Sequence, residues 1–561
     1  MTDSLDRRRI GLLFVCFFVM AVVLSGRLVY WQVLRRAELV EQATAQVRQA
    51  ESVAARRGHI YDHDGNLLAT TVALNSVYAL PRHVSEKSQV ARALSRALGS
   101  DAEVIRAKLE SGAEWIYLAR RVPEEASAVV RALEIPGIGL QPEPKRVYPN
   151  DRVAAALLGF VNDDGAGQSG VEARYDKVLG GVPGRLVLER DPARRALAVG
   201  VRELEPAIDG ADLVLTLDLV IQNAAERELE RAVKAEKATG GTIIVLEPDT
   251  GAILAIASTP GFDPNAFSRA DPEGFRDRAV SWTYEPGSTL KSVTIAAALN
   301  EHAVEPRTTY EDRGYAVIGG RTLHNAQGRV YGVLDISGIL ERSANAGAVF
   351  VAQRLGAERL YRYLMDFGFG RPTGVDLAAE AAGAVRRLDD WYPVDVGTAA
   401  FGQGLSVTPL QLAAAYGAIA NGGTLYRPYV VAELRSPSGV QRVAPQAIRR
   451  VIAPETAATM RELLTNAIDR GIAQGASVVG YSVAGKTGTA QIASPDGRYV
   501  DNEYISSFTG MLPARDPRFV ALVVLERPQS RLLGTVTAMT AFRGLAEDLV
   551  RHARVEPDRV R

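Results

Sequence analysis

The chain has 561 residues, which is too long for one ordinary domain and predicts two or three. Its 47% apolar and 23% charged content is that of a globular protein, which excludes a disordered chain. The 65 basic and 65 acidic side chains cancel, so no net charge steers the protein to nucleic acid or an acidic substrate. Cys16 is the only cysteine, and the six histidines form no H-E-x-x-H, so a disulfide framework and a zinc motif are both excluded.

The N-terminal segment predicts a membrane anchor. Residues 10–25 are an unbroken apolar or small-residue run after three arginines, and continuing to residue 33 makes it long enough to span a bilayer. Tyr30 and Trp31 suit the interface. A cleaved signal peptide is the rival interpretation, but no A-x-A site directly follows the run. We expect a cytoplasmic tail at 1–9, a transmembrane anchor at 10–33, and the remainder outside the cytoplasm.

Residues 34–210 predict an N-terminal module. Residues 35–56 lack turn residues and predict a helical stalk, 57–69 predict two strands joined by an Asp-Gly turn, and 85–133 are mostly helical. His59 and His63 suggest either a metal pair or a solvent-facing hairpin, and the lack of a nearby third ligand favours the hairpin. The turn-rich remainder contains no chemical constellation, so we interpret it as a structural spacer.

The residue composition of the chain changes at Ala211, and residues 211–561 are expected to form one domain. The pattern predicts strands at 213–218, 241–247, 253–257, 481–492, 508–511 and 519–525, and helices at 222–235, after Thr408, and at 540–553. Helices placed between two groups of strands favour an α/β arrangement, of the α+β type, with an antiparallel sheet.

The stretch Tyr284-Glu-Pro-Gly-Ser-Thr-Leu-Lys291 contains the first candidate for chemistry. Its Pro-Gly pair predicts a turn that delivers Ser288 to the first turn of a helix, with Lys291 on the same face. A lone S-x-x-K is weak, but only eight of the 65 cations are lysines, and only Lys291 and Lys486 follow Lys237. Arginine cannot act as a base in a protein, so a retained lysine is a candidate base for Ser288.

Two later stretches supply possible partners. Ser343-Ala344-Asn345 offers a hydroxyl that relays a proton and an amide that holds a peptide, although most such triplets are helix caps or turns. Lys486-Thr487-Gly488-Thr489 lies on a predicted strand, where Lys486 and the threonines are suited to a carboxylate and Gly488 leaves room for a close approach.

Residues 480–487 also match the phosphate-loop pattern G-x-x-x-x-G-K-[ST]. That motif needs a strand before the glycines and a helix after the lysine. Here residues 481–484 predict a strand and residues 488–495 cannot begin a good helix, so we reject a nucleotide site.

The order S-x-x-K, S-x-N, K-T-G-T is the serine acyl-transfer set of penicillin-binding proteins and serine β-lactamases. The chain resembles a class B penicillin-binding protein nearly from end to end, through R-G-x-I-x-D at Arg57, R-x-Y-P at Arg146, G-V-E at Gly170 and E-P-G-S-T-L-K. The stretch from Phe401 to Ala413 looks most like the division-specific, penicillin-binding protein 3 type. His63, where the family often has arginine, and the lack of proline before Phe542 are departures outside the motifs.

The resemblance implies a D,D-transpeptidase domain with a five-stranded antiparallel sheet behind an elongated pedestal, or dimerisation-type, module. It implies Ser288 as nucleophile, Lys291 as base and Ser343 as proton relay. Asn345, Lys486, Thr487, Gly488 and Thr489 would bind the substrate, and the backbone amides of Ser288 and Thr489 would form the oxyanion hole. No metal or cofactor is expected. The implied partners are stem peptides, β-lactams, a SEDS-type glycan polymerase and other division proteins, at the inner membrane and the septum.

Four alternatives use the same residues. An elongation-type transpeptidase and a D,D-carboxypeptidase share this motif set, and only family resemblance separates them. A serine β-lactamase needs a deacylating group, and the E-x-x-L-N pattern is absent between Ser343 and Lys486. A non-catalytic β-lactam receptor or scaffold is disfavoured because all the motif residues are intact.

Overall fold

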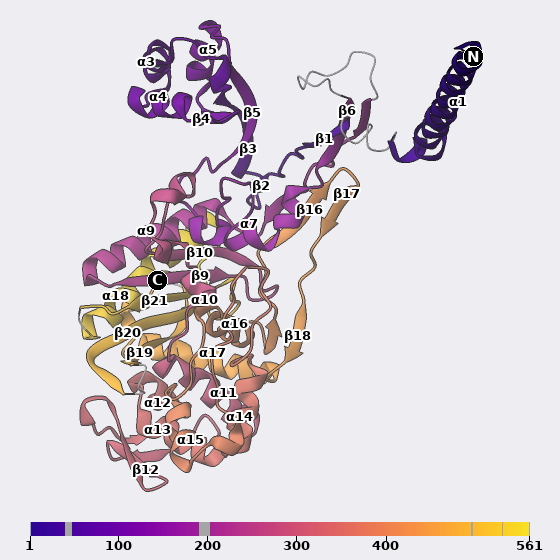
Figure 1. The fold of residues 1–561 in the computed structure, drawn as a ribbon. Coiled ribbons are helices and arrows are strands. Elements are labelled where there is room, and N and C mark those ends of the chain that lie inside the picture. Colours follow the sequence, from indigo (N-terminus) through magenta and orange to yellow (C-terminus); the bar gives the residue numbers. More distant parts are fainter. Residues whose placement is uncertain (1, 40–47, 190–201, 495–497, 530, 560–561) are drawn as a thin grey trace. The chain divides into compact units, whose positions relative to one another are not determined.

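The structure is a computed structural model that describes residues 2–39, 48–189, 202–494, 498–529 and 531–559. The chain divides into two compact units (Figure 1). The first comprises residues 1–56 with 181–210, and the second comprises residues 57–180 with 211–561.

The first unit contains the apolar N-terminal helix and a small sheet. Helix α1 (Thr2–Val29) continues into one π-helical turn (Tyr30–Leu34). An 18-residue stretch within residues 9–34 has a mean hydropathy of 2.5 and its side chains are unburied, so this helix fits a single-pass membrane anchor. Strands β1 (Arg48–Val53), β6 (Gly184–Glu189) and β7 (Arg202–Glu205) form an antiparallel sheet in the order β1-β6-β7.

The predicted helical stalk at 35–56 is wrong over residues 48–53, which form β1. The local sequence lacks turn residues, but β1 pairs along its whole length with β6, more than 130 residues later. Backbone pairing to a distant strand overrides a local helical preference. Residues 40–47 of the expected stalk lie outside the described residues.

The second unit begins with a twisted sheet that carries three helices. The predicted strand–turn–strand at 57–69 is confirmed by β2 (Ile60–Tyr61) and β3 (Leu67–Ala79). Strand β3 pairs with both β4 (Ile116–Val122) and β5 (Ile138–Val147). The expected helical region 85–133 contains α3 (Lys87–Leu98), α4 (Ala102–Glu110) and α5 (Glu124–Ala132), but β4 interrupts it as a strand because it pairs with β3.

The same sheet continues without a break into the C-terminal half of the chain. Strand β2 pairs in parallel with β8 (Asp212–Leu215), which pairs with β16 (Val431–Ser436) and then β17 (Gly439–Arg442). Strands from both sides of residue 211 therefore share one seven-stranded sheet.

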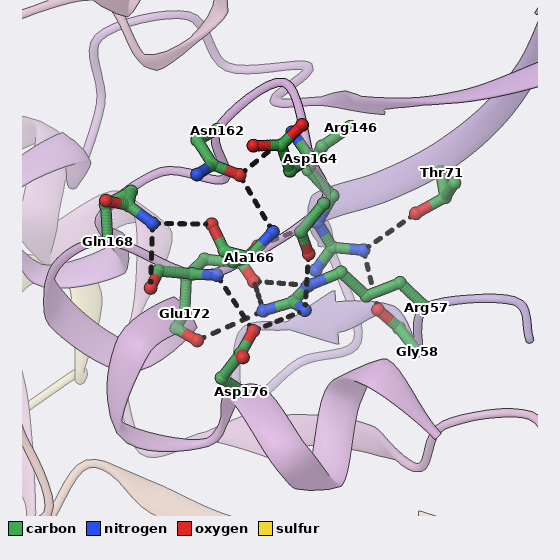
Figure 2. A network of polar contacts seen from close by, with 12 residues as sticks. Arg57, Gly58, Thr71, Arg146, Asn162, Asp164, Ala166, Gln168, Glu172 and Asp176 are labelled. Carbon is green, nitrogen blue, oxygen red and sulfur yellow. Dashed lines mark hydrogen bonds and ion pairs between the residues drawn. The ribbon is translucent and has the colours of Figure 1, made fainter. Parts of the chain in front are cut away.

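A buried charge network ties three sequence-distant segments together beside this sheet (Figure 2). Glu172, in the short helix α7 (Gly170–Arg174), is fully buried and binds Arg57 at 2.6 Å and Arg146 at 2.7 Å. Arg57 also binds Asp176 at 2.7 Å, and Arg146 donates to the carbonyl of Gly58 at 2.6 Å. The segment predicted to be a spacer thus contains buried ion pairs that hold its turns in place.

A second sheet has five antiparallel strands in the order β10-β9-β21-β20-β19, as predicted. They are β9 (Gly240–Leu246), β10 (Ile253–Thr259), β19 (Ala484–Ala493), β20 (Tyr499–Leu512) and β21 (Phe519–Glu526). Alternate residues of β9 enter different cores: Ile243 and Val245 face one cluster, and Ile244 and Leu246 the other. Both faces of the sheet are therefore covered, which explains its continuous apolar runs.

Helices cover each face of this sheet. Helices α9 (Leu219–Glu236) and α18 (Arg531–His552) share one core with the sheet, while α11 (Lys291–Asn300), α16 (Pro409–Ala420) and α17 (Pro454–Asp469) contribute to the other (Figure 1). The closing helix begins at Arg531, earlier than the predicted residue 540, and β19 begins at Ala484, later than the predicted 481. Residues 481–483 lie outside the strand and have no regular structure.

The remaining α-helices and the two-stranded sheets lie outside the two large sheets. The helices are α6 (Ala155–Leu158), α8 (Asp176–Gly180), α10 (Arg278–Ser281), α12 (Ile336–Arg342), α13 (Asn345–Leu355), α14 (Ala357–Asp366) and α15 (Pro393–Ala400). Three two-stranded ribbons are β11 (Tyr310–Asp312) with β14 (Gly332–Leu334), β12 (Tyr315–Ile318) with β13 (Arg321–His324), and β15 (Thr424–Tyr426) with β18 (Ala447–Arg450).

Replacing Glu172 with glutamine is expected to destabilise the fold by about 3–5 kcal/mol, because it leaves two buried guanidinium groups without their shared carboxylate. Thermal unfolding of the full chain in detergent measures the change. The matched control is Glu114→Gln, whose carboxylate lies 3.8 Å from Arg82 with both side chains mostly exposed. Equal melting temperatures for the two variants would show that the network contributes nothing to stability.

Candidate active site

Ser288 lies in a turn that is held tightly on both sides. The short helix η5 (Gly287–Leu290) is a 3₁₀ turn that runs directly into α11, as the Pro-Gly pair predicts. The Thr289 hydroxyl donates to the Pro286 carbonyl at 2.7 Å, and the buried Tyr416 hydroxyl donates to the Thr289 carbonyl at 2.8 Å. Ser288 itself lines a cavity of about 720 Å³. Among the residues that the structure describes, its hydroxyl has no hydrogen-bond partner.

Lys291 is fully buried and reaches the S-x-N stretch. Its Nζ donates to the Ser343 carbonyl at 2.6 Å and to Asn345 Oδ1 at 2.7 Å, and it lies 3.3 Å from Ser343 Oγ. The first two partners are carbonyl oxygens, which only accept. The Ser343 hydroxyl is the one partner of the three that either accepts from an ammonium group or donates to a neutral amine. Loss of a proton from Lys291 therefore allows the Ser343 hydroxyl to donate a hydrogen bond to the neutral amine.

Lys486 approaches the same hydroxyl from strand β19. Its Nζ lies 2.9 Å from Ser343 Oγ, 3.1 Å from the Thr487 carbonyl and 3.3 Å from Thr487 Oγ1. The side chain is 1% exposed. Ser343 Oγ thus lies between two lysine amines that come from different motifs.

Burial disfavours the charged form of both amines. Burial, with a smaller contribution from the charge of Lys486, holds the pKa of Lys291 well below its ordinary value of 10.5. Burial alone lowers the pKa of Lys486 to about 7. Neither amine has a carboxylate among its hydrogen-bond partners in the described part of the chain, so no counterion offsets the effect of burial. A lysine with a lowered pKa is suited to accept a proton near neutral pH.

The S-x-N stretch is placed by a strained helix end. Ser343 closes α12 in the left-handed region, with φ of 54°, and α13 begins two residues later at Asn345. This reversal directs both side chains toward Lys291. The Asn345 amide is oriented by two partners, since its Oδ1 accepts from Lys291 while its Nδ2 donates to the His324 carbonyl at 3.1 Å. A non-glycine residue at positive φ costs free energy and often marks a functional position.

Strand β19 presents Thr487 and Thr489 to the cavity. The Thr489 hydroxyl is 2.9 Å from the Thr535 hydroxyl of α18, so the closing helix orients it. Gly488 has a packing role: a Cβ there would lie 2.3 Å from Ser507 Oγ and 2.8 Å from Thr289 Cγ2. Its missing side chain lets β19 pack against the turn that carries Ser288.

The phosphate-loop interpretation of 480–487 is excluded by the local structure. Lys486 and Thr487 lie inside β19, which continues to Ala493 with no helix after the lysine. The motif would require that helix. Among the described residues, no group of three His, Cys, Asp or Glu side chains is arranged to hold a metal ion.

Several cavity-lining residues were not predicted from the sequence. They are Arg329 and Arg342, Gln403, Tyr504, and Thr535 with Met539 of α18. Gln403 lies in the Phe401-Gly-Gln-Gly stretch that supported the family resemblance. Arg342 directly precedes Ser343, although no motif marks it, and the others are brought to the cavity by the packing of their elements.

Comparisons with known proteins agree with this arrangement. Residues 241–545 match the model of the penicillin-binding protein transpeptidase domain, and residues 52–215 match that of the penicillin-binding protein dimerisation domain. The chain is 32% identical to the peptidoglycan D,D-transpeptidase FtsI of Escherichia coli K12, over 98% of this chain and 92% of FtsI. It is 34% identical to the stage V sporulation protein D of Bacillus subtilis, over 94% and 83% of the two chains.

Solved structures show the same fold. The structure of penicillin-binding protein 3 from Mycobacterium tuberculosis, complexed with aztreonam, matches with a TM-score of 0.72 and 28% identity. The match covers 91% of this chain and 98% of that one. Penicillin-binding protein 2X from Streptococcus thermophilus matches with a TM-score of 0.76 and 25% identity, over 90% and 81% of the two chains.

The lowered pKa of Lys486 predicts a pH-dependent stability. Between about pH 7 and pH 10.5 the unfolded chain binds a proton at Lys486 that the folded chain lacks, so the wild type gains stability as pH rises. The Lys486→Met variant lacks this gain. Unfolding of both proteins at several pH values across the window measures the difference. Parallel curves would contradict the assignment, as would the same divergence from wild type in Lys234→Met, which removes an exposed lysine of α9.

Proposed function

The chain belongs to the penicillin-binding protein family of peptidoglycan D,D-transpeptidases, and we propose that Ser288 forms its acyl-enzyme. The observation that carries this proposal is the convergence of Lys291 and Lys486 on Ser343 at the wall of the cavity that Ser288 lines. Ser288, the nucleophile, and Ser343 line this cavity, and the two amines of lowered pKa contact the Ser343 hydroxyl. That combination is suited to acyl transfer.

In the acylation step, Ser288 attacks the carbonyl carbon between the two D-alanines of a stem peptide. Its proton passes to the neutral amine of Lys291, and the Ser343 hydroxyl relays a proton to the leaving D-alanine amine. The contacts of Lys291 support the relay through Ser343, because Ser343 Oγ alone among the three oxygens described around Nζ both donates and accepts. The peptide bond breaks as the Ser288 ester forms, and D-alanine leaves.

The remaining motif residues position the donor peptide. Lys486, Thr487 and Thr489 bind the terminal carboxylate, and an incoming carboxylate favours the ammonium form of Lys486. Asn345 hydrogen-bonds the peptide backbone, and Gly488 keeps β19 against the turn of Ser288. The backbone amides of Ser288 and Thr489 form the oxyanion hole, in which each donor contributes about 3 kcal/mol to the transition state.

An acceptor amine from a second stem peptide then attacks the ester and forms the cross-link. β-Lactams acylate Ser288 in place of the donor. A D,D-carboxypeptidase would use water at this step with the same residues. Transpeptidation is favoured because the 98% coverage by the FtsI alignment includes the module ahead of the catalytic domain.

The family model supports the domain organisation expected from the sequence: a tail at 1–9, an anchor at 10–33, a pedestal or dimerisation-type module at 34–210 and a transpeptidase domain at 211–561. We place the N-terminus in the cytoplasm because Arg7, Arg8 and Arg9 precede the apolar helix. From the resemblance to division-type transpeptidases we propose a septal location, with a SEDS-type glycan polymerase and other division proteins as partners.

Covalent labelling with a fluorescent penicillin tests the nucleophile. The wild type is expected to give one covalent band, and Ser288→Ala none, because the variant has no hydroxyl to form the ester. Ser477→Ala is the control, since Ser477 is exposed and outside the cavity. A band that persists in Ser288→Ala would move the nucleophile elsewhere, and rapid hydrolysis of the drug would favour a β-lactamase.

The base is tested by replacing Lys291 with arginine, which keeps the positive charge but cannot accept a proton. Acylation by the same penicillin is expected to slow by about 10²–10⁴-fold. In the wild type, the acylation rate should rise with pH along a limb whose midpoint lies well below 10.5. Lys234→Arg serves as the control. A wild-type rate in Lys291→Arg would assign the base to another group.

A further inference from the structure

One wall of the cavity is a segment fastened to the S-x-N stretch by a buried asparagine. Asn325 is 3% exposed, and its Nδ2 lies 2.9 Å from both carboxylate oxygens of Asp312 and from the carbonyl of Arg329. Its Oδ1 accepts from the backbone amide of Ala346 at 2.9 Å, the residue after Asn345. The backbone at Arg329 is thus held at a fixed place relative to the catalytic motif.

Two arginine side chains place positive charge at the cavity. Arg329 follows Asn325 on the fastened segment, and Arg342 is the last residue of α12, next to Ser343. Both are exposed, and both line the cavity together with Ser288. No aspartate or glutamate lines the cavity within the part of the chain that the structure describes. The local charge therefore differs from that of the whole chain, which is balanced.

Both guanidinium groups also lack a counterion within the part of the protein that the structure describes. Within the described ranges, neither Arg329 nor Arg342 makes a side-chain hydrogen bond or an ion pair. Cations that line a reaction cavity without an internal counterion are available to an anionic ligand.

We infer that Arg329 and Arg342 form a subsite for a free carboxylate of the stem peptide other than its terminal one. This inference rests on the proposed function, because the peptide is placed in the cavity by its reaction with Ser288. The planar guanidinium group matches a carboxylate in two parallel hydrogen bonds. The terminal carboxylate is assigned to Lys486, Thr487 and Thr489, so the arginines serve a second anionic group.

The subsite gives the enzyme a substrate preference. A stem peptide whose upstream carboxyl groups are free gains an attraction that an amidated peptide lacks. Because both arginines are exposed, salt screens this attraction, and the preference should weaken as ionic strength rises. A penicillin has no upstream peptide, so its acylation of Ser288 does not depend on the subsite.

The test uses the full chain in detergent and two peptides that end in D-Ala-D-Ala. Their sequences are identical, but the upstream carboxyl groups are all free in one and all amidated in the other. Each peptide competes with fluorescent penicillin for Ser288, which yields an apparent inhibition constant. The proteins are wild type, Arg329→Gln, Arg342→Gln, the double variant, and the control Arg307→Gln, which removes an exposed arginine outside the cavity.

We expect each single variant to weaken competition by the free-acid peptide about threefold, and the double variant about tenfold. Competition by the amidated peptide and the Arg307→Gln control should match wild type, and penicillin labelling without peptide is measured for each variant so that its inhibition constants are corrected for any change in labelling. Unchanged competition by the free-acid peptide in the double variant would overturn the subsite, as would an equal loss for both peptides. Either result leaves the proposed function intact, whereas absence of penicillin labelling in wild type would remove both.

Discussion

Two buried lysine amines share one serine hydroxyl, and the rest of the catalytic domain is arranged around that contact. Lys291 comes from the central helix α11, Lys486 from strand β19, and Ser343 from the junction of α12 and α13. Burial at 0% and 1% exposure makes it costly to charge either amine. The neutral form that a base requires is thus supported by the packing of the core.

Two unusual backbone features hold these groups in place. Ser343 adopts a left-handed conformation at the end of α12, and Gly488 lets β19 lie against the turn of Ser288 where a side chain would meet Ser507. The amines also explain the composition of the C-terminal half, in which Lys291 and Lys486 are the only lysines after Lys237. Arginine replaces lysine on the surface without loss, but it cannot be neutral at these two positions.

Much of the site could be predicted from the sequence because its motifs are local. The Pro-Gly turn before Ser288, the helix end before Ser343 and the strand through Lys486 are each encoded within a few residues. The distances between them are not: α11, α12 and β19 meet through a core whose members come from positions between Ile60 and Val524. Arg329 was missed for the same reason, since only tertiary packing brings it to the cavity, whereas Arg342 adjoins the S-x-N motif but belongs to no motif itself.

Errors in the predicted fold arose where long-range pairing decides the structure. Residues 48–53 and 116–122 lie in stretches with helical character, yet both become strands through partners far along the chain. The spacer predicted around Glu172 holds a buried ion network because Arg57 and Arg146 converge on it from distant positions. The sheet that spans residue 211 joins the N-terminal module to the catalytic domain, so the change in composition there does not mark a break in backbone pairing.

The ionisation of the two lysine amines is open to direct observation, because the chain has only eight lysines. Nuclear magnetic resonance of side-chain-labelled lysine in the full chain can follow each titration. We predict two resonances that titrate below the rest, one near pH 7 for Lys486 and one well below 10.5 for Lys291, each absent from its methionine variant. Titration of all eight lysines near 10.5 would contradict the account.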